Sequence, residues 1–417
     1  MRFSGVRPYL VLLALLAGLA LGAVTGGFDE GFRSASLGTA EFVGGLWLNG
    51  LKMTVIPLVV ALLIVGISAG AQAARAGRIA AKAVLWIAII CTLSAIFGGL
   101  MIELLTSTFP LPRETAAALQ GALSGVDQSA ASGELPGVLD FFKNIIPSNI
   151  VSAAANGDVL PLVVFALLFA IAISRIDPVR GERIIGLFQA IADALLVIIH
   201  WVLALAPIGV FALAFTVGAS AGTAAFAGLG HYILLLSTVG LLVTLAAYPL
   251  AIFLGGIAPG TFVRGMIAPQ SVAISTRSSL ACLPAMLTSA RSMGIREGVA
   301  DVTLPLAVAL FRATGPAMNT AVAFYVAHWL GLQPSMTQIV AAVAVGAIMS
   351  YGAISLPGEV SFISSVAPIA MALGVPIAPL ALLVAVEMVP DIFRTLGNVT
   401  MDVAVSGVVD RGTREKH

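Results

Sequence analysis

Five polar side chains that could bind a charged ligand recur along one apolar segment near the end of the chain. They are Glu387, Asp391, Arg394, Asn398 and Asp402, with spacings of 4, 3, 4 and 4 residues, and we call them the polar stripe. At about 100° per helical residue they share one helix face about 80° wide. A guanidinium can hold a carboxylate through two hydrogen bonds, a neighbouring carboxylate can hold an ammonium, and the amide of Asn398 can take a second carboxylate. The stripe predicts a site for an acidic amino acid.

The polar stripe also has a simpler interpretation as a set of internal ion pairs. Asp391 and Glu387 precede Arg394 by three and seven residues, so both could neutralise it on the same helix. A charge at the bilayer centre costs about 2.5–3.5 kcal/mol, however, and ionisable residues inside membranes usually mark a substrate or ion path. We therefore favour a functional role.

A second unusual cation, Arg312, interrupts the apolar segment 307–327 beside the helix-breaking pair Gly315–Pro316. A guanidinium stays charged in proteins, so this charge is permanent. Arg312 could pair structurally or extend to the membrane surface. Its place beside a helix break favours a functional role.

The composition indicates which elements must position these residues. Hydrophobic residues make up 59% of the 417 positions and charged residues 10%, against about 25% charged residues in soluble domains. The mean hydropathy is +1.06. The net charge of +1 argues against a nucleic-acid partner, and two cysteines are too few for a disulfide framework or a zinc site. We predict an all-α polytopic protein whose partner is the lipid bilayer.

Apolar runs of spanning length dominate the first part of the chain, and broken runs dominate the second. The first set lies near 8–26, 42–70, 80–106, 145–174, 184–216 and 229–255. After residue 256, Pro, Gly and charges interrupt the runs, which cover 258–292, 299–331, 336–374 and 376–410. Broken, paired segments of this kind point to a transporter binding site.

The distribution of basic residues predicts the orientation. Lys and Arg gather on the cytoplasmic side if the N-terminus is cytoplasmic and if 258–292 and 336–374 each enter and leave on the same side. We therefore expect two re-entrant helical hairpins and cytoplasmic N- and C-termini in a prokaryotic cell membrane. Backbone at a hairpin tip must be buried in protein or line an aqueous cavity. Half-helices that meet there would present amides to an anion.

Several motifs resemble the dicarboxylate/amino-acid:cation symporter family, which includes the glutamate and aspartate transporters. LKMTVIPLVV (51–60) resembles its second helix, and APIGVFALAF (206–215) its fifth. STRSSLACLP (275–284) resembles the serine-rich first hairpin, and SLPGE (355–359) the second. DIFRTLGNVTMD (391–402) matches the polar positions of the family's D…RT…NVTGD motif.

The resemblance implies a glutamate-transporter fold with eight transmembrane helices and two re-entrant hairpins, assembled as a homotrimer. A fixed scaffold would comprise 1–79 (helices 1–2) and 111–228 (helices 4–5 and an extracellular loop). An elevator-type transport domain would comprise 80–110 (helix 3) and 229–417. The latter would contain helix 6, hairpin 1 (258–292), helix 7 (299–331), hairpin 2 (336–374) and helix 8 (376–410).

The resemblance also implies the roles of site residues. Asp391 would bind the substrate amino group and Arg394 its side-chain carboxylate. Asn398, Ser278 and Ser279 would hold the α-carboxylate. The other expected substrate-binding residues are Arg277, Thr314, Leu356, Pro357, Gly358 and Thr395, with Pro357 and Gly358 shaping the second hairpin as a gate.

One motif departs from the family pattern. Where relatives carry NMDGT in the seventh helix, the ungapped alignment places Phe311–Gly315, so Phe311 and Ala313 replace the Asn and Asp that help to bind sodium. Arg312 takes the Met position. Hard cations need several oxygen ligands, and a like charge about 4 Å away costs about 4 kcal/mol at an effective dielectric of 20. We predict that Arg312, paired with Asp402, substitutes for a coupling cation.

We expect no cofactor and no bound metal, with sodium disfavoured as the coupling ion. A proton is the alternative, and Glu359, Glu387 and Asp402 are the carboxylates that could carry it. Glu359 equally fits a solvated residue of a hairpin tip.

The predicted function is secondary active transport of aspartate or glutamate, without enzyme activity. The presence of both Asp391 and Arg394 favours an acidic amino acid as the small-molecule partner. The alternatives are a C4-dicarboxylate:cation symporter and an anion-conducting, channel-like member of the family.

Overall fold

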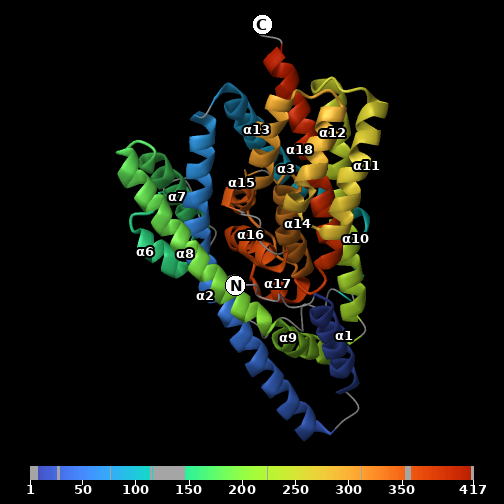
Figure 1. The fold of residues 1–417 in the computed structure, drawn as a ribbon. Helices are drawn as coiled ribbons and strands as arrows, with labels where there is room; N and C mark the ends of the chain where they lie inside the picture. Colours follow the sequence, from blue (N-terminus) through green and yellow to red (C-terminus); the bar gives the residue numbers. More distant parts are fainter. Residues whose placement is uncertain are drawn as a thin grey trace.

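The computed structural model describes residues 8–25, 29–75, 77–112, 115, 146–222, 224–310, 312–352 and 358–414, the last beginning with backbone alone at 358–361. Its elements are helices, and the described ranges contain no strand (Figure 1). The part of the chain before residue 256 contains α1 (Pro8–Val24), α2 (Glu30–Arg75), α3 (Arg78–Thr108), α6 (Ile150–Asn156), α7 (Val159–Ile173), α8 (Pro178–Ala204), α9 (Ala206–Ala221) and α10 (Ala224–Pro249), which continues into the π-helical turn η2 (Leu250–Leu254).

The part after residue 256 is a series of shorter helices followed by one long one. It contains α11 (Pro259–Thr276), α12 (Ser279–Ser292), α13 (Glu297–Leu310), α14 (Thr314–Trp329), α15 (Met336–Gly352), α16 (Gly358–Leu373), α17 (Ala378–Leu383) and α18 (Met388–Arg414). Within the described ranges, four helical stretches are long and apolar enough to cross a membrane: Glu30–Arg75, Arg78–Thr108, Pro178–Ala204 and Ala224–Leu254. A fifth, Glu297–Trp329, consists of α13 and α14 and includes Phe311, which lies outside the described residues. The predicted all-α class with many apolar helices is confirmed, and the count of eight crossings stays a prediction.

Two expected apolar runs are divided by local sequence signals. The run 145–174 breaks between α6 and α7 at Gly157. Its backbone φ of 76° lies in the left-handed region, which residues with a Cβ rarely adopt. The run 184–216 breaks between α8 and α9, because Pro207 in the first turn of α9 has no N–H to donate to the preceding helix.

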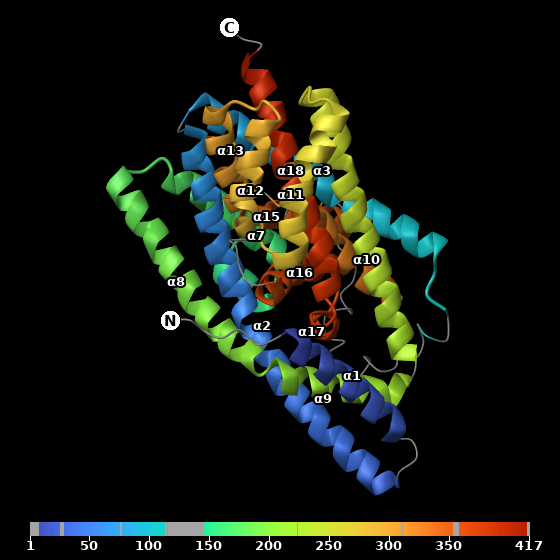
Figure 2. The ribbon, with the colours of Figure 1, turned by 45° about the vertical axis from the view of Figure 1, so that its right-hand side comes forward.

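The helices pack in two groups. α1 lies against α9, and α2 lies against α7, α8 and α9. In the other group, α3 packs against α14, while α18 packs against α10, α11 and α13. Figures 1 and 2 show these groups side by side, and α2 also contacts α3, α15 and α16. The scaffold and transport-domain boundaries that we expected from the sequence stay a prediction.

Helix pairs are present at both predicted hairpins. α11 and α12 fold back on each other around Arg277 and Ser278. Arg277 has a φ of 50°, and its N–H bonds to the carbonyl of Ala273, which ends α11. Ser278 then begins α12 by accepting a hydrogen bond from the N–H of Ala281 at 3.3 Å. α15 and α16 also pack together, and their connection at 353–357 lies outside the described residues.

Basic residues connect several helix ends at one end of the molecule, where the C-terminus lies (Figure 1). Asp410 of α18 pairs with Arg296 at 2.6 Å and with Arg414 at 2.7 Å. Lys82 of α3 donates to the carbonyl of Gly412, and Arg411 donates to that of Phe253. Basic residues of α3, of α18 and of the segment before α13 therefore lie together at this end. The orientation of this end toward the cytoplasm stays a prediction.

Candidate substrate-binding site

The polar stripe lies on a buried face of the last helix. Glu387 precedes α18, and the N–H of Asp391 bonds to the carbonyl of Glu387 at 2.9 Å, which carries the helical path through the start of α18. Exposed fractions run from 9% at Asp391 down to 0% at Asp402. Because α18 packs against α10, α11 and α13, the stripe faces protein. This is the position expected for functional charges in a membrane protein.

Arg394 makes both ion pairs that the simpler interpretation predicts. Its Nη1 lies 2.5 Å from Oε1 of Glu387 and 3.2 Å from Oδ1 of Asp391. Its Nε and Nη2, however, are buried and have no hydrogen-bond partner among the described residues. These two nitrogens form one edge of the guanidinium, and that edge matches the two oxygens of a carboxylate. Internal ion pairing therefore uses only Nη1 of the Arg394 guanidinium and leaves its other two nitrogens without an acceptor among the described residues.

Glu387 has a second partner that our sequence argument missed. Tyr232 of α10 is fully buried and donates its hydroxyl to Oε2 of Glu387 at 2.8 Å. A buried tyrosine usually requires a hydrogen-bond partner, so its presence inside an apolar run was a signal. The identity of that partner, 155 residues away, depends on the packing of α10 against α18.

The connection between α11 and α12 reaches the polar stripe. Nη1 of Arg277 lies 3.9 Å from Oδ2 of Asp391. Ser278 and Ser279 stand beside it at the start of α12 and are half-buried. The structure thus brings Arg277 to Asp391, with the two predicted serines next to Arg277 in the chain.

Thr314 and Asn398 bind each other across the helix break. The N–H and the hydroxyl of Thr314 both donate to Oδ1 of Asn398, at 3.0 and 2.5 Å, and the hydroxyl also lies 2.5 Å from the carbonyl of Arg394. Since the N–H of Thr314 can only donate, the oxygen of the Asn398 amide must face it. Asn398 therefore contributes its amide nitrogen alone to any ligand. Thr395 bonds within α18, to the carbonyl of Asp391 at 3.0 Å.

Arg312 lies beside the site and at the break between α13 and α14. Together with Arg394 it lines a small cavity of about 10 Å³, room for about one water, whose other polar lining residues are Asn319, Ser350 and Ser365. Arg312 is within electrostatic range of Asp391, Arg394 and Asp402. Both carboxylate oxygens of Asp402 are buried and lack a hydrogen-bond donor among the described residues.

The second hairpin is described in part. Leu356 and Pro357 lie outside the described residues, as does the side chain of Glu359. Gly358 begins α16.

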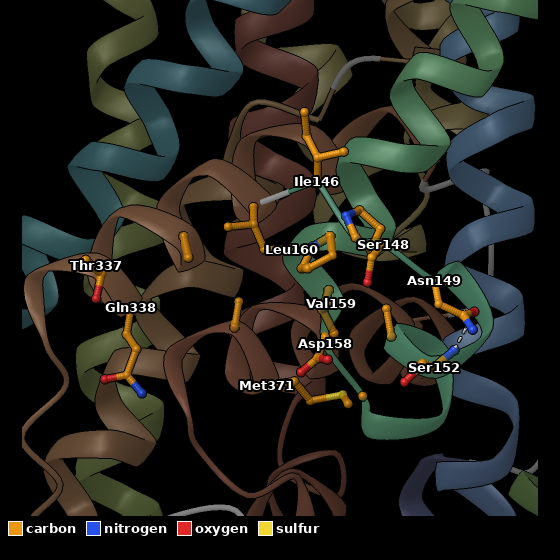
Figure 3. A pocket seen from close by; sticks show the side chains of 16 residues that line it. Ile146, Ser148, Asn149, Ser152, Asp158, Val159, Leu160, Thr337, Gln338 and Met371 are labelled. Atoms are coloured by element: carbon orange, nitrogen blue, oxygen red, sulfur yellow. Dashed lines mark hydrogen bonds between the residues drawn. The ribbon is translucent and has the colours of Figure 1, made fainter. Parts of the chain in front are cut away.

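A larger cavity of about 650 Å³ lies between the α6–α7 segment and the α15–α16 pair. Figure 3 shows Ser148, Asn149 and Asp158 on one side and Thr337 and Gln338 on the other. No residue of the polar stripe lines it. Within the described ranges, no group of three or more His, Cys, Asp or Glu side chains is arranged to hold a metal ion.

Known transporters are similar to this chain along nearly its whole length. The chain matches the sodium:dicarboxylate symporter family over residues 9–412. A proton/glutamate-aspartate symporter of Escherichia coli (strain K12) is 25% identical over 93% of this chain and 89% of that protein. A proton/sodium-glutamate symport protein of Bacillus subtilis (strain 168) is 28% identical, with 95% and 91% covered.

A third relative is named for a dicarboxylate and not for an amino acid. A C4-dicarboxylate transport protein of Laribacter hongkongensis (strain HLHK9) is 27% identical over 96% of this chain and 88% of that protein. The motif resemblance is therefore confirmed across nearly the whole sequence. The chain belongs to the sodium:dicarboxylate symporter family, whose members are membrane transporters and not enzymes.

Proposed function

We propose that this multi-pass membrane symporter transports acidic amino acids, aspartate or glutamate, by secondary active transport. One observation carries the proposal: the buried Nε–Nη2 edge of Arg394 has no hydrogen-bond partner among the described residues. Because that edge is complementary to a carboxylate, and two buried donors without acceptors are costly, the substrate carboxylate binds there.

Asp391 favours an amino acid over a dicarboxylate. It stands one helical turn before Arg394 and is held between that residue and Arg277. An ammonium group beside Asp391 gains a charge-assisted hydrogen bond, whereas a second carboxylate there would be repelled. The α-carboxylate then has donors in the amide nitrogen of Asn398 and in Ser278 and Ser279 at the N-terminus of α12.

We propose further that transport does not require sodium. Three cations (Arg277, Arg312 and Arg394) and three carboxylates (Glu387, Asp391 and Asp402) surround the site, so their formal charges cancel in the substrate-free state without a sodium ion. Ala313 offers no side-chain oxygen where relatives by motif have an Asp. The guanidinium of Arg312 is within electrostatic range of Asp402, and it repels a second cation there.

The proposed mechanism is an elevator in a homotrimer. The scaffold would contain α1, α2 and α6–α9, and the moving domain would contain α3 and α10–α18. The two packing groups support this division, because the hairpins, the break at Arg312 and the polar stripe all belong to the second group.

Uptake by purified protein in liposomes tests the substrate assignment. We expect saturable accumulation of labelled L-aspartate, strong competition by L-glutamate, and weak competition by succinate and L-serine. Preferred uptake of succinate would instead support the C4-dicarboxylate alternative. A flux that neither saturates nor accumulates substrate would support the channel alternative.

A further inference from the structure

Glu387 is a buried carboxylate whose two oxygens have different partners. Oε1 lies 2.5 Å from Nη1 of Arg394, and Oε2 accepts a hydrogen bond from Tyr232 at 2.8 Å. The residue is 2% exposed, so water contributes little to its solvation. Its charge is therefore stabilised mainly by Arg394.

A substrate carboxylate on Arg394 changes that balance. Nη1 of the guanidinium already faces Glu387 and Asp391, and the substrate would occupy the edge formed by Nε and Nη2. Three carboxylates would then share one guanidinium in a buried site. Because a buried charge without full compensation is strongly unfavourable, one carboxylate gains by taking up a proton.

The groups around Glu387 identify which carboxylate that is. Asp391 keeps a second cation, Arg277, at 3.9 Å and also faces the substrate ammonium. Glu387 faces Tyr232 of α10, whose ring contacts that of Tyr325 of α14 at 5.4 Å between centroids. Glu387 thus has one cationic partner among the described residues, and the substrate competes for that partner.

Tyr232 suits both charge states of Glu387. A phenolic hydroxyl can donate to a carboxylate and can accept from a protonated carboxylic acid. The buried hydrogen bond therefore survives protonation, with its direction reversed. A phenylalanine in this place would leave the ionised carboxylate without its second donor.

We propose that Glu387 carries the coupled proton: it binds a proton from water as the substrate carboxylate binds Arg394, and it releases that proton to water on the other side as the substrate leaves. This inference rests on the proposed function, and it assigns the coupling to Glu387, the candidate carboxylate that is paired with Arg394. The substrate and the proton are then linked through one guanidinium.

Transport by the full-length protein in sodium-free liposomes tests the assignment. In the wild type, the apparent affinity for labelled L-aspartate should rise by up to about tenfold for each unit that the external pH falls, as expected for one linked proton. An inward proton gradient should drive accumulation. In Glu387→Gln, a neutral mimic of the protonated acid, exchange of internal for external L-aspartate should continue, its KM should not vary with pH, and accumulation should be lost.

Two further variants test the partner of Glu387 and provide a control. Tyr232→Phe removes a donor to the ionised carboxylate, so protonation becomes easier and the midpoint of the pH profile should move to higher pH. Glu297→Gln is the matched control, because Glu297 is an exposed acid of α13, and its profile should equal that of the wild type.

The results separate failure of the Glu387 assignment from failure of the proposed function. Glu387→Gln with a wild-type pH profile, or folded Glu387→Gln without exchange, would overturn the inference. If Glu387→Gln does not fold, an unshifted midpoint in Tyr232→Phe would overturn it. Absence of exchange of L-aspartate in the wild type would instead refute the proposed function, and the inference with it.

Discussion

Arg394 has two functions that depend on different parts of one guanidinium. Nη1 holds Glu387 and Asp391, while Nε and Nη2 are the donors that we assign to the substrate. A lysine would keep the charge near the two acids and would lose the planar pair of donors. Structural pairing and substrate binding can therefore be separated by one substitution.

The first prediction follows from that difference. Arg394→Lys should fold, yet its affinity for L-aspartate should fall by about 10- to 100-fold, since a charge-assisted hydrogen bond contributes about 1.5–3 kcal/mol. The saturation curve of uptake measures this, and Arg291→Lys, which alters an exposed ion-pairing arginine at the end of α12, is the control. An unchanged KM in Arg394→Lys would show that the free edge does not bind substrate.

Asn398 has a structural function that can be measured separately. Asn398→Ala leaves the N–H of Thr314 without its acceptor in a fully buried position. We expect a loss of about 1–3 kcal/mol of stability, seen as a lower unfolding temperature of the detergent-solubilised protein. Gln189→Ala, which removes an exposed hydrogen bond to Asp193, should leave that temperature unchanged. Equal temperatures for both variants would contradict the assigned contact.

At the scale of elements, close helix contacts position the break that contains Arg312. A Cβ added at Gly98 of α3 would lie 2.0 Å from the carbonyl oxygen of Ala317 in α14. The absence of a side chain at Gly98 thus allows α3 to support the first turns of α14. Small residues permit this kind of close approach between membrane helices.

Gly98→Ala should therefore destabilise the protein although alanine favours helices. We expect a loss of about 1–3 kcal/mol through overpacking and a lower unfolding temperature. Gly186→Ala in α8 is the matched control, because a Cβ there meets nothing within 4 Å, and stability should stay equal or rise slightly. The prediction fails if both variants unfold at the same temperature.

The sequence predicted the elements that depend on local periodicity and turn chemistry. The polar stripe followed from helical spacing, and the α11–α12 hairpin followed from the interrupted apolar run and the distribution of basic residues. Contacts between distant segments were not predictable. The pairing of Tyr232 with Glu387 and of Thr314 with Asn398 requires the packing of α10 and α14 on α18, which no local pattern encodes.

At the scale of the whole molecule, the proposed elevator requires the two packing groups to slide. Val55 of α2 and Ile363 of α16 line one small cavity between the groups. We expect that a cross-link between Val55→Cys and Ile363→Cys, made after Cys91 and Cys282 are replaced by serine, abolishes uptake and that reduction restores it. Each single-cysteine variant under the same treatment is the control. Full uptake with the cross-link in place would contradict relative motion of these elements.

In the proposed transport cycle, Arg312 takes the place of a sodium ion. The most direct measurement is accumulation of labelled L-aspartate by wild-type protein in liposomes, with an inward sodium gradient or an equal gradient of choline, under the same inward proton gradient and the same membrane potential. We predict equal accumulation under both gradients. Accumulation that is several-fold higher with sodium would show that Arg312 does not replace the ion.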